Sequence, residues 1–233
     1  MKKKVLAIIP ARAGSKSIKN KNILNFLGKP LLAWTIEHCL KSKQIDETYL
    51  STDSEKYANI ARKYGLKKII LRPKNLSKDK SPDIDFILHA IKQIKNEYEY
   101  IAHLRPTTPI RNVKMIDKII IYFKKSSKSY SSLRTVHEEP ETSYKSFEIK
   151  NNKLKPLKTL KLSIDELNSP RQSLAKTYSA NGVLDLYKKS HVIKKKKLFG
   201  NKVLSYITSF TPELDTKDQI NLLKIYAKNK NIK

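Results

Sequence analysis

The sequence predicts an α/β protein built on a doubly wound, mostly parallel sheet. Apolar, β-prone runs alternate along the chain with helical patterns, and most of the segments between them are short. Residues 5–9 form an unbroken apolar run, which is typical of a strand buried on both faces of a parallel sheet. A length of 233 residues suffices for a proper core, and we expect residues 1–233 to form a single domain.

The predicted elements follow one another in regular alternation. After the first strand, helices are predicted at 29–43, 54–66, 82–96, 112–125 and 216–229, and strands at 45–53, 67–73, 98–106 and 202–208. Pro30 suits the first turn of its helix, and Ser54 and Gly65 are start and stop signals for the next helix. Strands and helices of these lengths indicate βαβ crossovers.

Residues 130–170 are predicted to form an excursion from this sheet, because the alternation fails between about 130 and 187. The stretch 129–157 has the pattern of strands joined by a hairpin at Asn151 and Asn152. A polar, irregular stretch follows as far as Pro170. The α/β pattern returns with the strand predicted at 202–208.

The formal net charge of +28 is the most unusual feature of the composition. Seven of the 49 basic residues are arginine, and the lysines are scattered along nearly the whole chain. We interpret the lysine excess as solvated surface, and the run at 194–197 as an exposed helix end. Arginines are better site candidates, because only the guanidinium offers a planar fork for phosphate or carboxylate. Five of them lie in short motif-like stretches: Arg12, Arg72, Arg105, Arg111 and Arg171.

A basic nucleic-acid-binding protein is the rival interpretation of this charge. No RNA- or DNA-binding signature accompanies it, so we expect no nucleic-acid partner. The N-terminal apolar run is too short for a signal peptide and ends at Pro10, and no segment is long enough to span a bilayer. The single cysteine, Cys39, excludes a disulfide framework, and the five histidines have no metal-ligand spacing. We therefore expect a cytoplasmic protein without a membrane partner.

The loop after the first strand is the first candidate site. The stretch "IPARAGSKSIKNKN" holds one glycine, so it matches neither the Walker A loop nor the dinucleotide fingerprint. Small residues at 11 and 13–15 still allow backbone N–H groups to approach an anion, and the basic side chains can supply the charge. Ligands of open α/β sheets bind at the carboxyl ends of strands, which favours an anion site here over a basic surface loop.

This loop resembles the N-terminal signature of the acylneuraminate cytidylyltransferases, the CMP-sialic acid synthetase family of nucleotidyltransferases. Further matching stretches follow in the order of that family: "LSTDS", "LRPKNLSKDKS", "LRPTTPIR", "RQ" with "YSANG", and "ELDTKDQINLL". Together they span nearly the entire chain, and the first and fourth are specific. The resemblance implies a Rossmann-like nucleotidyltransferase fold.

The resemblance also implies the reaction, in which a sugar hydroxyl attacks the α-phosphate of CTP and expels pyrophosphate. The attacking group would be the anomeric hydroxyl of a nine-carbon α-keto acid sugar, with Mg²⁺ bridging the phosphates. The catalytic residues implied are Lys21, which would stabilise the α-phosphate under attack, Arg12 and Asp215. The nucleotide-binding residues implied are Arg12, Ser15, Lys16, Lys21, Asn22, Arg72, Ser77 and Ser81. Lys19 is expected to be surface.

The sugar-binding residues implied are Arg105, Thr107, Arg171, Gln172, Tyr178 and Asn181. Glu213 and Asp215 would hold the metal ion, since alternate residues of an extended segment point the same way. The alternative is that Thr216 caps the final helix, with Asp215 or Asp218 complementing its N-terminus. The excursion at 130–170 corresponds to a dimerisation segment, so the resemblance implies a homodimer in which Lys145 and Arg171 act across the interface.

Several residues depart from the pattern of the sialic acid enzymes. Arg105 stands where they typically carry glutamine, Asp185 where an aromatic residue is expected, Ala175 where proline is usual, and Glu213 where the first metal-binding aspartate is expected. Arg105 can grip an acceptor carboxylate through two hydrogen bonds. The acceptor can therefore be another nonulosonic acid of the legionaminic or pseudaminic type, or a more distant sugar acid. GTP in place of CTP, or a relative that has lost turnover, are further alternatives.

Overall fold

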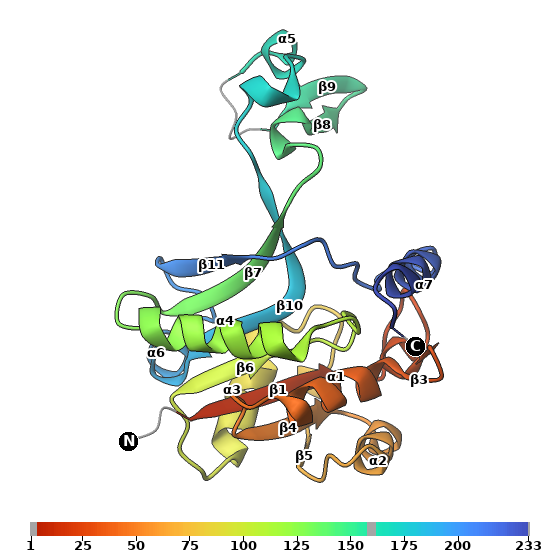
Figure 1. The fold of residues 1–233 in the computed structure, drawn as a ribbon, viewed down its shortest axis with the longest axis vertical. Coiled ribbons are helices and arrows are strands. Elements are labelled where there is room, and N and C mark those ends of the chain that lie inside the picture. The colour runs from red at the N-terminus through yellow and green to blue at the C-terminus, as the bar shows by residue number, and fades with distance from the viewer. Residues whose placement is uncertain (1–3, 158–161, 233) are drawn as a thin grey trace.

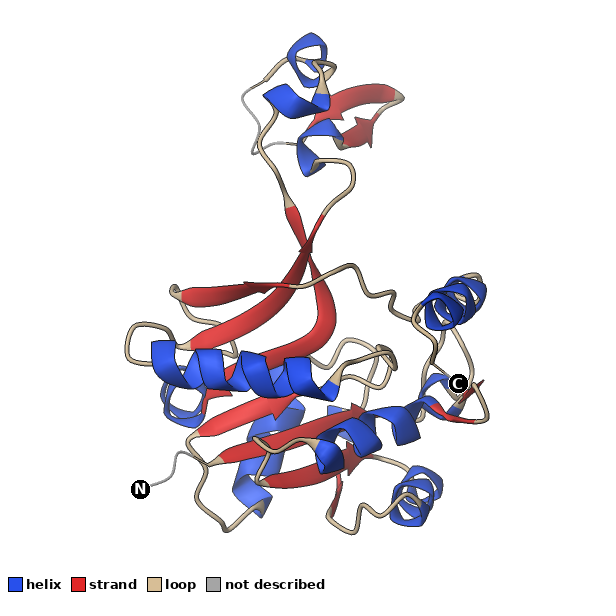
Figure 2. Ribbon diagram, viewed as in Figure 1, coloured by secondary structure: helices blue, strands red, loops and turns tan. Residues whose placement is uncertain are grey.

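A seven-stranded sheet with the order β11-β7-β10-β6-β1-β4-β5 forms the centre of the molecule (Figures 1 and 2). The computed structural model describes residues 4–157 and 162–232. In chain order the strands of this sheet are β1 (Val5–Ala11), β4 (Glu47–Thr52), β5 (Ile69–Leu71), β6 (Tyr100–His103), β7 (Ser132–Glu138), β10 (Tyr178–Lys188) and β11 (Val203–Ile207). Each predicted strand of the main sheet has a counterpart here.

The sheet is mostly parallel, as the sequence predicts. β1 pairs in parallel with β4 and β6, β4 with β5, and β11 with β7. β10 is antiparallel to both of its neighbours, β6 and β7. β10 is the strand of this sheet that the sequence did not predict. Its register shifts between Ala180 and Asp185, which marks a bulge.

Helices cover both faces of the sheet, so β1 is buried on both sides. Val5, Ala7 and Ile9 share one cluster of buried residues with side chains of α1, α2 and α4, whereas Leu6 and Ile8 share another with α3 and α6. This split follows from the two-residue period of a strand. The helices concerned are α1 (Leu31–Lys41), α2 (Glu55–Lys63), α3 (Asp83–Gln93), α4 (Val113–Ser126) and α6 (Lys189–Lys195).

The predicted helix signals are present in the structure. The Ser54 hydroxyl accepts a hydrogen bond from the backbone N–H of Tyr57 at the start of α2, and Gly65 takes a φ of +86° just after its end. α7 (Gln219–Asn229) begins later than the predicted residue 216. The reason is a turn in which the Gln219 side chain accepts hydrogen bonds from the N–H groups of Asp215 and Thr216, at 2.6 and 3.0 Å.

Residues 139–157 and 162–177 form an arm that projects away from the sheet between β7 and β10 (Figure 1). The arm carries η3 (Ser143–Lys145), β8 (Phe147–Lys150), β9 (Lys153–Pro156), α5 (Ile164–Leu167) and η4 (Arg171–Ser173). β8 and β9 form the predicted hairpin, with φ values of 51° and 59° at Asn151 and Asn152. The excursion begins later than the predicted residue 130, because β7 buries alternate side chains in the central sheet.

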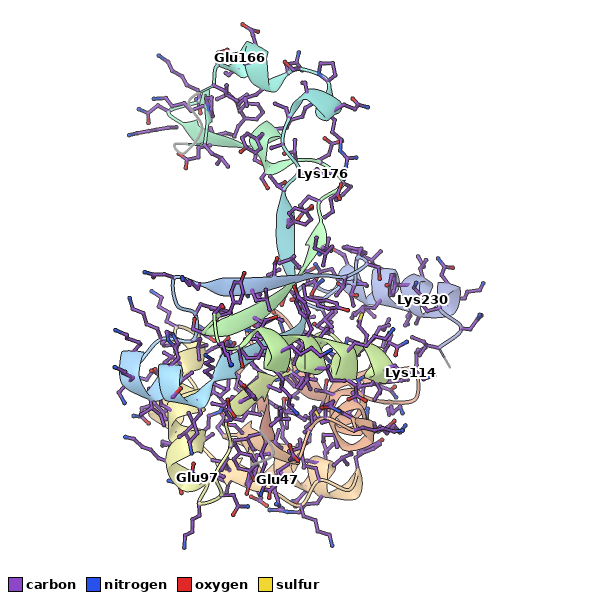
Figure 3. All side chains as sticks on the ribbon, turned by 60° about the vertical axis from the view of Figure 1, so that its left-hand side comes forward. Glu47, Glu97, Lys114, Glu166, Lys176 and Lys230 are labelled. Atoms are coloured by element: carbon purple, nitrogen blue, oxygen red, sulfur yellow. The ribbon has the colours of Figure 1, made fainter. Side chains whose placement is uncertain are left out.

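Basic side chains extend from many sides of the molecule, among them Lys114 on α4, Lys176 on the arm and Lys230 at the end of α7 (Figure 3). Residues 194–197 are exposed at the end of α6, which confirms the predicted exposed helix end. Over residues 4–157 and 162–232, no helix has both the length and the apolar composition that crossing a membrane requires.

Candidate active site

The loop that follows β1 is fixed to its neighbours by hydrogen bonds at both ends. The Thr52 hydroxyl at the end of β4 donates to the carbonyl of Ala11 at 2.6 Å, and Asp53 accepts from the N–H of Ala13 at 2.9 Å. The side chain of Asn22, which is buried, donates to the carbonyl of Arg12 at 2.9 Å. These bonds hold a loop that has only one glycine in a defined shape at the carboxyl edge of the sheet.

An open cavity of about 540 Å³ lies against this loop. All of the predicted nucleotide-binding residues except Ser77 line it, and two of the predicted sugar-binding residues, Arg105 and Thr107, line it as well. Segments far apart in the sequence therefore contribute to one site, because β1, β5 and β6 all end at this edge of the sheet. The predicted residues in the wall are Arg12, Ser15, Lys16, Lys21, Asn22, Arg72, Ser81, Arg105 and Thr107.

Arg12 and Lys16 share one carboxylate at the wall of the cavity. Asp79 accepts from Arg12 Nη1 at 2.6 Å through one oxygen and lies 2.7 Å from Lys16 Nζ through the other. These two cations lower the pKa of Asp79, so the carboxylate is ionised around neutral pH. Asp79 was not predicted as a site residue, although it lies inside the quoted stretch "LRPKNLSKDKS". Asp79 therefore pairs with two of the cations that the sequence assigns to phosphate and offsets one of their two positive charges.

Lys21 connects the cavity with the predicted metal-binding segment. It follows Asn20, whose left-handed backbone (φ of 57°) turns the chain into η1 (Lys21–Ile23). The side chain of Lys21 is 14% exposed, and its Nζ lies 2.9 Å from Oδ1 of Asp215, which is 61% exposed. A lysine held this way has little conformational freedom left to lose when a ligand binds. Lys19, by contrast, is exposed, and its side chain makes no hydrogen bond or ion pair in the described part of the chain.

Arg72 presents a largely buried guanidinium to the same cavity. One of its terminal nitrogens donates to the carbonyl of Ser51 at 3.0 Å, and its guanidinium lies 5.0 Å from the centre of the Phe86 ring. Burial lowers the pKa of Arg72 to about 10, against the opposite effect of Asp53 and Asp83, so the group stays protonated around neutral pH. A cation with few local partners is well placed to attract an anionic ligand.

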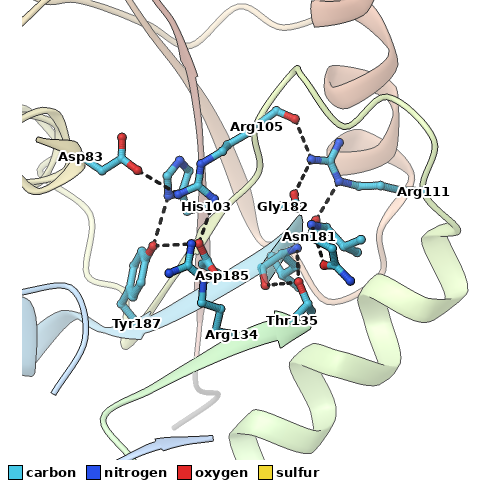
Figure 4. A network of polar contacts seen from close by, with 12 residues as sticks. Asp83, His103, Arg105, Arg111, Arg134, Thr135, Asn181, Gly182, Asp185 and Tyr187 are labelled. Atoms are coloured by element: carbon cyan, nitrogen blue, oxygen red, sulfur yellow. Dashed lines mark hydrogen bonds and ion pairs between the residues drawn. The ribbon is translucent and has the colours of Figure 1, made fainter. Parts of the chain in front are cut away.

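Arg105 is fixed between two carboxylates (Figure 4). Its Nη1 donates to Asp185 and its Nη2 to Asp83, both at 2.8 Å. Burial alone would lower the pKa of Arg105, but the charges of Asp185 and Asp83 outweigh it and raise the pKa. Arg105 and Asp185 are both departures from the sialic acid enzymes, and they are partners in one ion pair. The charge that Asp185 brings to this position is therefore matched by that of Arg105.

Arg111 has a structural role in this arrangement. It is buried, and its guanidinium donates to the carbonyls of Val183, Gly182 and Arg105 at 2.7, 3.0 and 2.6 Å. Burial lowers its pKa to about 10, which still leaves it charged around neutral pH. Arg111 joins the loop after β6 to the bulged part of β10, and it does not line the cavity.

Glu213 and Asp215 lie on the segment that leads into α7. The N–H of Leu214, between them, donates to the carbonyl of Thr107 at 2.9 Å, which brings this segment to the wall of the cavity. Burial raises the pKa of Glu213, and the charge of Asp215 acts in the same direction. Gly182 makes room for Glu213, because a Cβ at this positive-φ position would overlap the Glu213 carboxylate.

The remaining predicted residues lie outside the cavity of this chain. Asn181 is buried, and its amide donates to the Thr208 hydroxyl at 2.6 Å. The hydroxyl of Ser77 is buried beside η2 (Lys74–Leu76). The arm, which projects away from the body in Figure 1, carries Lys145, Arg171 and Gln172. Tyr178 is the first residue of β10, where the arm ends.

A mostly parallel sheet with a cation-lined cavity after its first strand, and a carboxylate pair beside it, is the arrangement expected of a nucleotide-binding protein of the α/β class. The family model described as "Cytidylyltransferase" matches residues 6–233, and the chain belongs to this family. This assignment confirms the resemblance found in the sequence. Cytidylyltransferases of this family generally need a divalent metal ion.

Two curated relatives are similar to this chain. The N-acylneuraminate cytidylyltransferase of Escherichia coli O18:K1:H7 (strain RS218 / NMEC) is 36% identical over 226 residues, which cover 95% of this chain and 51% of that protein. The pseudaminic acid cytidylyltransferase of Campylobacter jejuni subsp. jejuni serotype O:23/36 (strain 81-176) is 38% identical over 140 residues, 59% of this chain and 60% of that protein. The chain thus spans about half the length of the first relative and 60% of the second.

The fold is also that of a solved structure described as CMP:2-keto-3-deoxy-manno-octonic acid synthetase complexed with CTP. The TM-score is 0.73, and the match covers 97% of this chain and 99% of the other. The two sequences are 14% identical, so this likeness concerns the fold alone. It confirms the predicted α/β architecture.

Proposed function

We propose that this protein transfers the cytidylyl group of CTP to an acidic sugar of the nonulosonic acid class. The sugar hydroxyl oxygen attacks the α-phosphorus, a new P–O bond forms, and the bond from the α-phosphorus to the bridging oxygen breaks. Pyrophosphate leaves with the electron pair of the broken bond, and the hydroxyl proton passes to water. The cavity at the end of β1, with its lining of Arg12, Lys16, Lys21 and Arg72, is the observation that carries the proposal.

The triphosphate of CTP is held by the loop after β1. Arg12, Ser15 and Lys16 bind phosphate oxygens, and Asn22 keeps the loop in shape through its bond to the Arg12 carbonyl. Lys21 is the residue that stabilises the α-phosphate, because its ammonium is held in place at the inner end of the loop. Phosphoryl-type transfer depends mainly on positioning and on stabilising spread negative charge, which fixed cations supply.

The base and the acceptor occupy opposite parts of the site in this proposal. Arg72 and Ser81 lie on the base side, where hydroxyl and backbone groups can meet a pyrimidine edge. The resemblance also assigns Ser77 to the base, although Ser77 does not line the cavity. Arg105 and Thr107 lie on the acceptor side. An arginine is a strong receptor for a carboxylate, which supports an acidic sugar as the acceptor.

Asp79 competes with the triphosphate for Arg12 and Lys16, so we expect Asp79→Asn to lower the Kd for CTP by about two- to fivefold. Isothermal titration calorimetry with CTP, without acceptor, measures this. Asp165→Asn removes the same charge from an exposed position on the arm and serves as the control. Weaker binding of CTP by Asp79→Asn would show that Asp79 assists the ligand instead of competing with it.

The cofactor proposed is Mg²⁺, held by Asp215 and Glu213. In the described residues no three or more His, Cys, Asp or Glu side chains gather as a metal cage. One or two carboxylates completed by phosphate oxygens and water are the donor set that Mg²⁺ takes, so these residues fit it. When bound, Mg²⁺ neutralises charge on the phosphates. The ammonium of Lys21 pairs with the carboxylate of Asp215, so the protein itself places a cation beside the proposed metal site.

Glu213→Gln is expected to make the protein more stable around neutral pH and less active. The folded state raises the pKa of Glu213 above its ordinary 4.5, so stability is lost as the pH rises through the raised pKa. Glutamine carries no charge and avoids this loss. Thermal unfolding of both proteins from pH 4 to pH 8 measures the difference in Tm, which should vanish at the acid end. A lower Tm for the variant at pH 8 contradicts this account of Glu213.

We also propose a homodimer in which the arm completes the partner's cavity. Two observations support this: within one chain, Arg171 and Lys145 lie outside the cavity, and the arm exposes apolar side chains such as Ile149, at 77%. Tyr178, Gln172 and Arg171 would then reach the acceptor of the partner. The cytoplasm, where CTP is formed, is the compartment proposed.

Mixing two inactive variants tests the shared site. Subunits with Lys21→Ala and subunits with Arg171→Ala should recover about one quarter of the wild-type activity after exchange, because mixed dimers hold one intact site. Each variant alone should stay inactive. A monomer in light scattering, or no recovery in the mixture, would rule the shared site out.

The reaction itself is tested by pyrophosphate release. The protein is incubated with Mg²⁺, with CTP or GTP, and with N-acetylneuraminic, pseudaminic or legionaminic acid. The proposal predicts release with CTP and at least one of these acids, and none with neutral hexoses. Release with GTP and not with CTP would show that the nucleotide is GTP. No release with any pair would contradict the proposed activity.

A further inference from the structure

The two carboxylates on Arg105 differ in how firmly they are held. The side chain of Asp185 is 2% exposed, whereas that of Asp83 is 43% exposed. Asp185 lies on β10 within the sheet, and its register partners are His103 on β6 and Arg134 on β7. Asp83 comes from the first turn of α3 and lines the cavity, as Arg105 does. One partner of Arg105 is therefore fixed, and the other is open to replacement.

Asp185 is held by more than one group. Besides Arg105, the Arg134 guanidinium lies 3.5 Å from Oδ1 of Asp185. The Tyr187 hydroxyl donates at 3.4 Å to Oδ2, the oxygen that also accepts from Arg105 (Figure 4). Removing a buried carboxylate from between two arginines would leave two like charges facing each other. Asp185 thus keeps the guanidinium of Arg105 in one orientation, with Nη2 directed to the cavity side.

Among the described residues, the side chain of Asp83 makes one hydrogen bond, to Arg105, and its charge also acts on Arg72. A partly exposed ion pair contributes little stability, and water or another anion can take the place of one partner. Together, Arg105, Arg134, Asp185 and Asp83 carry no net charge. When Asp83 turns away, one positive charge is left unmatched at the cavity wall.

We propose that Asp83 is an internal stand-in for the anionic group of the acceptor. An acceptor carboxylate replaces Asp83 on Nη2 of Arg105, while Asp185 stays in place and positions the guanidinium. This inference rests on the proposed function and deepens it, because it selects acceptors that carry a carboxylate at this point over neutral sugars. A neutral sugar cannot replace the charge of Asp83, so it leaves the site closed.

Binding of N-acetylneuraminic acid and of its methyl ester, measured by calorimetry without CTP, tests this directly. Asp83→Asn should lower the Kd for the acid about three- to fivefold and leave the Kd for the ester unchanged. Asp85→Asn is the matched control, since it removes the same charge from the same first turn of α3 and should change neither value by more than about twofold. Unchanged or weaker binding of the acid by Asp83→Asn overturns the proposal, as does equal tightening of the ester.

The positioning role of Asp185 is tested with the conservative change Asp185→Asn. In the wild-type background it should raise the KM for the acid about tenfold, with a smaller effect on kcat. In an Arg105→Gln background it should change KM by less than about twofold, because the residue acts through Arg105. Equal effects in both backgrounds would mean that Asp185 acts on the fold alone.

These measurements separate the inference from the proposed function. Tighter binding of the acid by Asp83→Asn, without pyrophosphate release from any nucleotide, would support the carboxylate receptor and contradict the transfer. Pyrophosphate release with an acidic sugar, without any gain for Asp83→Asn, would support the transfer and overturn the inference. If neither the wild type nor Asp83→Asn binds the acid, the inference is overturned as well.

Discussion

Lys21→Ala is expected to lower kcat by about 100- to 1,000-fold, whereas Lys19→Ala should stay within about twofold of the wild type. Both variants lose one lysine from the same loop, so they change the net charge equally. Only Lys21 has a largely buried side chain at the cavity wall, with its ammonium 2.9 Å from Asp215. The difference between the two variants therefore measures placement and not charge.

Steady-state pyrophosphate release with saturating CTP measures the effect of Lys21→Ala. We expect kcat to fall more than the affinity for CTP, because Lys21 acts on the α-phosphate during attack, and Arg12 and Lys16 remain to bind the nucleotide. Equal activities of the Lys21 and Lys19 variants would show that the roles within the loop have been misassigned.

Arg111→Ala is expected to lower the free energy of unfolding by about 3–5 kcal/mol. The buried guanidinium donates to three backbone carbonyls, and its removal takes a buried donor away from each of them. The Arg105 carbonyl keeps the N–H of Thr108 and the hydroxyl of Thr35 as donors. Since one of these carbonyls belongs to Arg105, the variant should also bind the acceptor more weakly. Urea unfolding followed by circular dichroism gives the free energy.

Arg62→Ala is the control for this stability effect. Arg62 is exposed on α2 and pairs with Glu55 and Asn59, so its removal should cost no more than about 0.5 kcal/mol. A loss below 1 kcal/mol for Arg111→Ala would mean that the loop after β6 and the bulge of β10 are held together by other contacts.

The sequence predicted the strands and helices that follow local rules. β1 is apolar throughout because both faces are covered, and α2 begins and ends at the residues whose chemistry caps a helix, Ser54 and Gly65. Local rules missed β10, because Asp185 interrupts its apolar run. The counter-ion that makes Asp185 acceptable there is Arg105, which is 80 residues away in the chain. A contact of that kind is a property of the fold and leaves no local signal.

The cations of the candidate site were predicted from the sequence, whereas its carboxylates Asp79 and Asp83 were not. Its cations could be predicted, because strand-end loops rich in basic residues and a family resemblance both pointed to them. Asp79 and Asp83 were missed, because a carboxylate is not expected in a site that binds anions. Their place is explained only by the cations with which they pair while no ligand is bound. Arg105, which the resemblance assigns to the sugar, lines the cavity, whereas Arg111, a candidate only because it lies in the same motif, serves the fold.

Transfer of label from CTP that carries ³²P at the α-phosphate tests the central claim most directly. With Mg²⁺ and the acidic sugar that the panel identifies, the label should appear in a sugar nucleotide, and unlabelled pyrophosphate should form in equal amount. Lys21→Ala should slow both products alike. Label that stays in CTP, or that appears only as free CMP whether or not the sugar is present, would contradict a cytidylyltransferase acting on an acidic sugar.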